Sequence, residues 1–272
     1  MSEWPLLILA LALLGSFAGF LAGLLGVGGA LVMIPFLTFL LHHLDISTDM
    51  SVKMAIATGM STIVVTSLAS TRAHHQAGAV RWDLFKGLVP GLMFGSVISG
   101  VWLFSIIKGA MLALLFGGFT AFSATQMLID KKPKPSRQMP SAWGQSIVGS
   151  VIGMVSGLVG AGGAFMSVPF MTWCNVPLRQ AVGTSAALGF PIALVNALGY
   201  GISGWSVTDT PPHSMGYVWL PGFFTICVCT VFTAPMGARF AQRLPVAKLK
   251  RGFALLLYVL ACTMFYRGLT AS

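Results

Sequence analysis

The sequence predicts an all-α polytopic membrane protein built from two inverted repeats, and three observations support this. Eight apolar stretches are long enough to span a bilayer, a glycine-rich segment occurs twice, and the basic residues collect in alternate loops. Of the 272 residues, 56% are hydrophobic and only 8% are charged, whereas a soluble domain carries about 25% charged residues. This composition excludes a soluble enzyme, a disordered chain and a nucleic-acid-binding module.

The apolar stretches define the predicted spans, because about 20 helical residues cross the roughly 30 Å hydrocarbon core. The eight candidates are Leu6–Leu25, Met54–Thr71, Leu88–Ile107, Ala110–Ile129, Gln145–Val159, Ala181–Ile202, Tyr217–Gly237 and Gly252–Phe265. No Lys or Arg precedes the first stretch, so we predict a retained span rather than a cleaved signal peptide. Two shorter runs, Ala30–Leu41 and Ala164–Trp173, predict short or re-entrant helices; the sequence leaves open whether they cross fully.

The basic residues predict the orientation in the membrane. If the N-terminus lies outside and each short run returns the chain to the side it came from, 13 Lys and Arg residues face the inside. Only Lys53, Lys108 and Arg267 then face the outside. We therefore expect a multi-pass protein of the plasma (inner) membrane with its N-terminus outside and the linker 130–140 in the cytoplasm. The net charge of +10 is mostly a signal of topology.

The internal repeat divides the chain. Residues 19–38 match residues 153–172 at an offset of 134, with the glycines, Pro35/Pro169 and Phe36/Phe170 identical. Equivalent loops carry opposite charge bias: 72–86 has three basic residues and 203–217 has none, whereas 107–109 has one and 239–251 has five. The repeats are therefore predicted to be inverted, with about five helical segments each. Their predicted bounds are 1–129 and 141–272, joined by the basic, Pro-rich linker 130–140.

Each repeat carries the glycine motif just before its short helix. One interpretation is close helix packing through small residues. The other is a helix break, because several glycines at about 1 kcal/mol each disfavour a helix. Free N–H groups at the start of the next helix would then form an anion site from the backbone. The predicted substrate-binding residues of the two motifs are Gly26, Gly28, Gly29, Ala30, Gly160, Gly162, Gly163 and Ala164.

Hydroxyl side chains give the second predicted part of the substrate site. Thr58, Thr62 and Thr66 recur at helical spacing on one face, with Ser61 beside them. The counterpart span offers Thr184, Ser185 and Asn196. The alternative is that each hydroxyl bonds to its own helix backbone. No Asp or Glu lies deep in a predicted span, so a carboxylate proton relay is not evident and an anion fits better than a cation.

No cofactor, catalytic residue or metal site is predicted. The four cysteines lie in or beside apolar stretches and lack metal-ligand spacing. His74-His75 at a predicted span end suits either interfacial solvation or pH sensing. The expected partners are the lipid bilayer and a small anion, with no nucleic acid; homo-oligomerisation stays open.

The paired segments Gly-Leu-Leu-Gly-Val-Gly-Gly-Ala and Gly-Leu-Val-Gly-Ala-Gly-Gly-Ala, each followed by an apolar residue-Pro-Phe, closely resemble the sulfite exporter TauE/SafE family of integral membrane permeases. The resemblance covers essentially the whole chain. It implies transport of small sulfur-containing anions such as sulfite or organosulfonates, with export as the implied direction.

The predicted function is therefore a secondary transporter that works by alternating access around a midplane site formed by the two glycine-rich breaks. The alternatives are an uptake permease for another small anion, an anion channel and an intramembrane enzyme. The last is disfavoured because the sequence has no Gly-x-Ser-x-Gly nucleophile motif.

Overall fold

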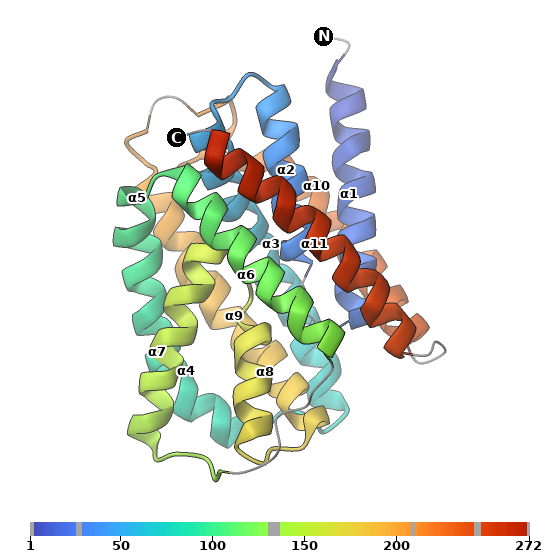
Figure 1. The fold of residues 1–272 in the computed structure, drawn as a ribbon, viewed down its shortest axis with the longest axis vertical. Helices are drawn as coiled ribbons and strands as arrows, with labels where there is room; N and C mark the ends of the chain where they lie inside the picture. Colours follow the sequence, from blue (N-terminus) through green and yellow to red (C-terminus); the bar gives the residue numbers. More distant parts are fainter. Residues whose placement is uncertain (1–2, 26–28, 130–136, 208–209, 242–245, 271–272) are drawn as a thin grey trace.

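The computed structural model describes residues 3–25, 29–129, 137–207, 210–241 and 246–270, and almost all of them are helical. The first half contains α1 (Glu3–Leu25), α2 (Ala30–His43), α3 (Thr48–Gln76), α4 (Trp82–Val97), the π-helical turn η1 (Ile98–Leu103), α5 (Phe104–Ile106) and α6 (Gly109–Ile129). The second half contains α7 (Ala142–Val159), α8 (Ala164–Trp173), α9 (Leu178–Ser203), the strands β1 (Ser214–Met215) and β2 (Val218–Trp219), α10 (Leu220–Ala241) and α11 (Val246–Thr270). Figure 1 shows them as one helical bundle.

Eight helices of the described chain are long and apolar enough to cross a membrane, which confirms the all-α polytopic prediction. They are Trp4–Ala22, Thr48–Gln76, Trp82–Ile106, Gly109–Ile129, Ala142–Val159, Leu178–Ser203, Leu220–Gly237 and Arg251–Thr270. Each overlaps one predicted span. The seventh begins at Leu220 rather than at Tyr217, because Val218 and Trp219 form the second strand of a short antiparallel hairpin.

The two short helices turn back. In Figure 1, α1 descends from the N-terminus and α2 rises again to the same end, whereas α7 rises from the opposite end and α8 descends to it. Helix α8 has the predicted bounds, and α2 ends at His43, two residues beyond the predicted Leu41. Each short helix contains its motif proline, Pro35 or Pro169.

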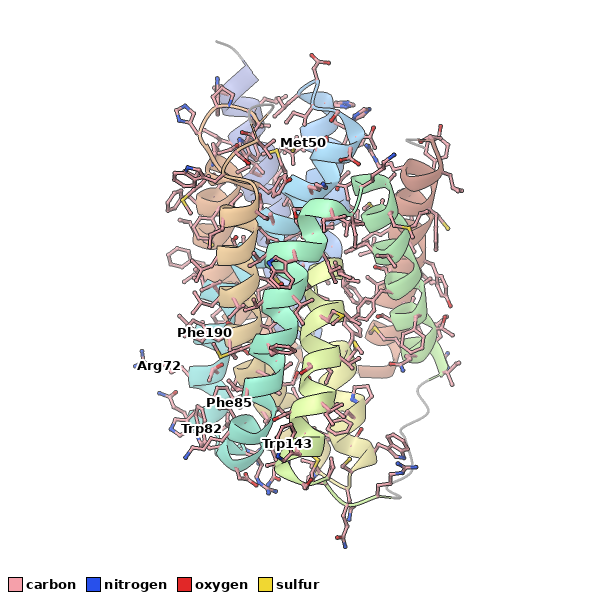
Figure 2. The ribbon with its side chains drawn as sticks, turned by 90° about the vertical axis from the view of Figure 1, so that its left-hand side faces the viewer. Met50, Arg72, Trp82, Phe85, Trp143 and Phe190 are labelled. Carbon is pink, nitrogen blue, oxygen red and sulfur yellow. The ribbon has the colours of Figure 1, made fainter. Side chains whose placement is uncertain are left out.

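This path gives the molecule two faces. The terminal face holds the start of α1, the loop 44–47, the loop 107–108, the β1–β2 hairpin and the end of α11 (Figure 1). The linker face holds the turn 77–81, residues 137–141 and the loop 174–177. Figure 2 shows Met50 near the terminal face and Arg72, Trp82 and Trp143 near the linker face.

The two halves pack on each other in equivalent ways. Helix α1 lies against α10, and its equivalent α7 lies against α4. A Cβ atom built at Gly15 of α1 would lie 3.0 Å from the Cα of Ile226, and one built at Gly149 of α7 would lie 2.5 Å from the Leu88 carbonyl oxygen. Gly15 and Gly149 are 134 positions apart, as in the sequence repeat. The glycines thus allow the helix backbones to approach closely. Because α1 of the first half packs on α10 of the second, and α7 of the second half packs on α4 of the first, these contacts join the two halves.

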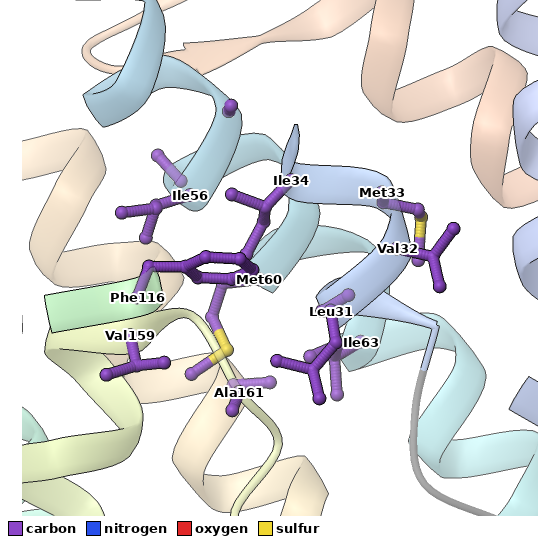
Figure 3. Close-up of a cluster of buried hydrophobic side chains, with 14 of the residues drawn as sticks. Leu31, Val32, Met33, Ile34, Ile56, Met60, Ile63, Phe116, Val159 and Ala161 are labelled. Atoms are coloured by element: carbon purple, nitrogen blue, oxygen red, sulfur yellow. The ribbon is translucent and has the colours of Figure 1, made fainter. Parts of the chain in front are cut away.

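The centre of the bundle is apolar. Helices α3 and α9 pack against each other there. Figure 3 shows Ile34 of α2, Ile56 and Met60 of α3, Phe116 of α6 and Val159 of α7 gathered close to Ala161, and all of them belong to one buried cluster. Large apolar side chains on the outside of the bundle are instead exposed, as lipid-facing residues of a spanning helix are; examples are Leu6, Phe94, Phe232 and Leu269.

The close approach of α4 and α7 generates a stability prediction. A Cβ atom at Gly91 would lie 1.8 Å from the carbonyl oxygen of Ser146, so Gly91→Ala forces the two backbones apart. We expect a loss of about 1–3 kcal/mol, typical of overpacking, seen as a lower melting midpoint of the protein in detergent. Gly118→Ala is the matched control, because a Cβ there meets nothing within 4 Å. Equal midpoints for the two variants would contradict the packing described.

Candidate functional site

The second glycine motif is a true helix break. Gly160 ends α7 with φ +69° and Gly163 precedes α8 with φ +77°. Both values lie in the left-handed region, which glycine adopts without a steric penalty. Among the residues of the first motif, Gly29 precedes α2 with φ −72°, and Ala30 begins that helix. Gly26 and Gly28 lie outside the described residues.

The break leaves the start of α8 without a cap. The carbonyl of Gly163 accepts the amides of Met166 and Ser167 at 3.1 and 2.9 Å. Within the described chain, no hydrogen bond runs from the amides of residues 162–165, and no side chain caps the helix. The first N–H groups of a helix carry the positive end of its dipole. Together with the nearby hydroxyl of Ser156, whose Oγ would lie 3.4 Å from a Cβ at Gly163, these backbone donors suit an anion.

Apolar side chains surround the same loop. A Cβ atom at Gly160 would lie 2.6 Å from Cδ1 of Ile34, and one at Gly163 would lie 2.7 Å from Cδ1 of Ile192. Gly162 has more room, since its Cβ would lie 3.4 Å from Cγ2 of Ile63. The loop thus passes between α3 and α9, and the central apolar cluster closes it towards α2 in this state of the protein.

The hydroxyls Ser61 and Thr62 bond within their own helix, as the alternative interpretation holds. Ser61 Oγ donates to the Ala57 carbonyl at 2.8 Å, and Thr62 Oγ1 donates to the Gly59 carbonyl at 2.7 Å. Thr62 Oγ1 also lies 3.8 Å from Sδ of Met33. A Cβ atom at Gly29 would lie 2.7 Å from the Ala18 carbonyl oxygen and 3.0 Å from Cε of Met33, so this methionine lies between the hydroxyl face of α3 and the start of α2.

Thr58 and Thr184 make the same contact in the two halves. Thr58 Oγ1 accepts the backbone amide of Trp219, just before α10, at 3.0 Å. Thr184 Oγ1 accepts the backbone amide of Arg81, just before α4, at 2.9 Å. Both threonines are fully buried. The first contact joins α3 of the first half to the start of α10 in the second half, and the other joins α9 of the second half to the start of α4 in the first. The evident role of the two threonines is to position α4 and α10.

Ser185 and Asn196 have partners on neighbouring helices. Ser185 Oγ lies 2.8 Å from Oγ of Ser167 in α8. Asn196 Oδ1 accepts Ser99 Oγ at 3.2 Å, and its Nδ2 donates to the Ile192 carbonyl at 2.8 Å. Ser99 lies in η1, a π-helical turn, and such turns often occur at functional sites. Ser99 was not predicted as a site residue, because nothing in its sequence context indicates the π turn.

Asn196 lies one helical turn from the break. A Cβ atom at Gly157 of α7 would lie 2.2 Å from its Oδ1, and Gly157 comes three residues before Gly160. The hydroxyl of Tyr200 donates to the Gly157 carbonyl. The structure therefore places Asn196, Ser99 and Tyr200 against the end of α7, whereas Thr58 and Thr184 lie towards opposite ends of the bundle.

The two short helices, α2 and α8, are buried to different extents. Nine of the fourteen residues of α2 are buried, against two of the ten in α8, Ser167 and Met171. Beside α8, a groove of about 440 Å³ is lined by Ile147, Val151, Met166 and Phe170 among other apolar residues. A second groove of about 450 Å³ lies between α6 and α7 and is also apolar. Such linings suit lipid chains rather than an anion.

Basic side chains on the linker face connect its segments by hydrogen bonds and an ion pair. Arg179 donates from Nη2 to the Ala77 carbonyl at 2.7 Å. Arg81 pairs with Asp83, and this hydrogen-bonded ion pair raises the pKa of the Arg81 guanidinium. Arg81 also reaches Gln180 Oε1 at 3.5 Å. His75 accepts the indole N–H of Trp82 at 3.3 Å, so this histidine has a local structural contact.

One protein family and several known proteins are similar in sequence to this chain. The sequence pattern of the family Sulfite exporter TauE/SafE matches residues 11–264. A Haemophilus influenzae protein named "Probable membrane transporter protein" is 35% identical over 96% of this chain and 98% of its own. A probable membrane transporter protein of Methanocaldococcus jannaschii is 27% identical over 89% of both chains. YdhB of Bacillus subtilis, named likewise, is 30% identical over 90% of this chain and 93% of its own. No solved structure matches the chain.

The paired threonine contacts generate a second prediction. Thr58→Val removes the acceptor of the buried Trp219 amide and Thr184→Val that of the partly buried Arg81 amide; the loss of such an acceptor costs about 1–3 kcal/mol. We expect both variants to melt at lower temperature in detergent by similar amounts, because the contacts are equivalent. Thr58→Ser and Thr184→Ser keep the oxygen and serve as controls. A valine variant as stable as its serine control would show that the contact contributes nothing.

Proposed function

Because the chain belongs to the sulfite exporter TauE/SafE family and is a membrane transporter, not an enzyme, we propose that it exports small sulfur-containing anions such as sulfite or organosulfonates. The observation that carries this proposal is the uncapped start of α8, where backbone amides without hydrogen-bond partners lie at a break inside the bundle. Helix N-termini bind oxyanions without any cationic side chain.

The charge distribution of the spans supports an anion. Within the described spans, acidic residues occur in the first turns of α3 and α4, as Asp49 and Asp83. A buried cation would need a carboxylate deeper in the membrane. The proposed substrate site comprises the two glycine motifs, with Asn196 and the hydroxyls of α3 and α9 as supporting groups.

We propose alternating access between the halves 1–129 and 141–272 as the mechanism. In inverted-repeat transporters, access changes when one repeat rocks or gates against the other around a fixed site. The unequal burial of α2 and α8 supports this, because equivalent helices occupy a tight and a loose environment in one state. Exchange of these environments would transfer the tight packing from α2 to α8.

Gly162→Leu tests the substrate site. A Cβ atom fits at Gly162, 3.4 Å from Cγ2 of Ile63, but the longer side chain of leucine has to displace Ile63 or the loop that leads into α8. We expect flux of labelled sulfite and small sulfonates into proteoliposomes to fall more than about tenfold, equivalent to about 1.4 kcal/mol, with normal membrane insertion. Gly162→Ala is the control and should retain flux. Normal flux in Gly162→Leu would return the motif to a packing role, and wild-type protein that moves no sulfur anion would refute the substrate class.

The proposed orientation has its own test. We propose that the terminal face is outside and that the linker 130–140 is cytoplasmic, because 13 of the 16 basic residues then face inside. Lys108 and Ser141 are exposed on the terminal and linker faces. In intact cells, a membrane-impermeant thiol reagent should label Lys108→Cys but label Ser141→Cys only after permeabilisation. The reverse pattern would invert the orientation.

A further inference from the structure

Lys53 stands apart from the other charged residues. It is the one charged residue classed as buried among those whose exposure the structure describes, with 7% of its surface exposed. It lies in the second turn of α3, inside a membrane span. A buried ammonium group is costly in a membrane, and such residues usually mark a substrate or ion pathway.

The contacts of Lys53 leave its charge incompletely matched. Its Nζ donates to the Ser105 carbonyl at 3.3 Å, although an ammonium group has three protons to donate. The Oδ2 atom of Asp49 is 3.9 Å away, beyond hydrogen-bond distance. Asp49 is itself half exposed and uses its Oδ1 to accept the amide of Gly109. The nearest carboxylate is thus shared with another donor and with water.

An aromatic column connects Lys53 with the candidate site. Nζ lies 5.6 Å from the ring centre of Tyr217, which the hairpin supplies. The ring of Tyr217 contacts Phe104, with centres 5.6 Å apart, and Phe104 contacts Tyr200 at 4.2 Å. The hydroxyl of Tyr200 then reaches the Gly157 carbonyl beside the break. Lys53 therefore lies at the terminal-face end of a continuous line of residues leading to α7.

We propose that Lys53 binds the transported oxyanion at the terminal-face end of the pathway, with Asp49 as the competing negative charge that the anion displaces. This inference rests on the proposed function, since it assumes an anionic substrate. A compact ammonium group with unused donors matches the oxygens of a small oxyanion. The hairpin residue Tyr217, 4% exposed, covers the site in this state, so the hairpin must move for the anion to pass.

Charge-changing variants separate this role from a purely structural one. Lys53→Gln removes the charge but keeps an N–H donor for the Ser105 carbonyl. Asp49→Asn removes the competing charge but keeps the Oδ1 acceptor for the Gly109 amide. Lys108→Gln removes an exposed positive charge on the same face and controls for long-range electrostatics. Lys53→Arg keeps the charge and serves as a conservative rescue.

Two measurements are made on the full-length protein. The first is the half-saturating concentration of sulfite flux in proteoliposomes. The second is the melting midpoint with sodium sulfite, methanesulfonate, acetate or chloride at constant ionic strength. We expect Lys53→Gln to raise the half-saturating concentration about tenfold and to abolish the anion-dependent midpoint shift. Asp49→Asn should lower or preserve that concentration, while Lys108→Gln should behave as wild type.

The outcomes distinguish this inference from the proposed function. If wild type carries sulfite but Lys53→Gln matches Lys108→Gln, the Lys53 site is overturned and sulfite transport stands. If Lys53→Gln and Asp49→Asn impair binding equally, the pair is structural and the inference is also overturned. If acetate alone is carried and shifts the midpoint through Lys53, the site stands while the sulfur substrate fails. A wild type that responds to no anion overturns both.

Discussion

The hydrocarbon core of a bilayer supplies no water to a broken helix, and the rest of this fold follows from that constraint. The second glycine motif interrupts a helix and leaves backbone amides without partners, so this break must be enclosed by protein, water or ligand. Helices α3 and α9 enclose it on two sides, and the cluster around Ile34, Ile56 and Ala161 closes a third. The close glycine contacts of α1 with α10 and of α7 with α4 hold this enclosure together.

The two halves correspond to each other in their contacts more closely than in the sequence spacing of the residues that make them. Thr58 and Thr184 are 126 positions apart, whereas their amide partners Trp219 and Arg81 are 138 apart. The difference arises because the second half inserts the β1–β2 hairpin where the first half has the short turn 77–81. The insertion preserves the threonine contact and adds Tyr217 above Lys53. The terminal face has thereby acquired a cover that its inverted counterpart lacks.

Hydropathy predicted the spans because twenty consecutive apolar residues have few alternatives to crossing the membrane. The break at Gly160–Gly163 was predictable for a local reason, since glycine propensity acts on the residues themselves. The partner of Thr58 was not predictable, because Trp219 lies 161 positions away and approaches only through the packing of the two halves. The same holds for Ser99 and Asn196, whose contact depends on the π turn. Tyr217 was assigned to the seventh span because the apolar residues Val218 and Trp219 that follow it resemble the start of a membrane helix, although they form a strand of the hairpin.

The unequal burial of α2 and α8 cannot come from the motifs, which share their glycines, proline and phenylalanine. It must come from the neighbours: α2 is enclosed by α3 and the central cluster, while α8 borders an apolar groove that lipid can fill. Two short helices with the same motif thus lie in two environments, and the proposed alternating access would exchange them between two packings of similar free energy. A transporter needs such near-balance, because a substrate can shift a population only by its difference in affinity for the two states. In the proposed alternating-access mechanism the repeat would be the source of reversibility, and the β1–β2 hairpin, which the first half lacks, would make the two directions of access different.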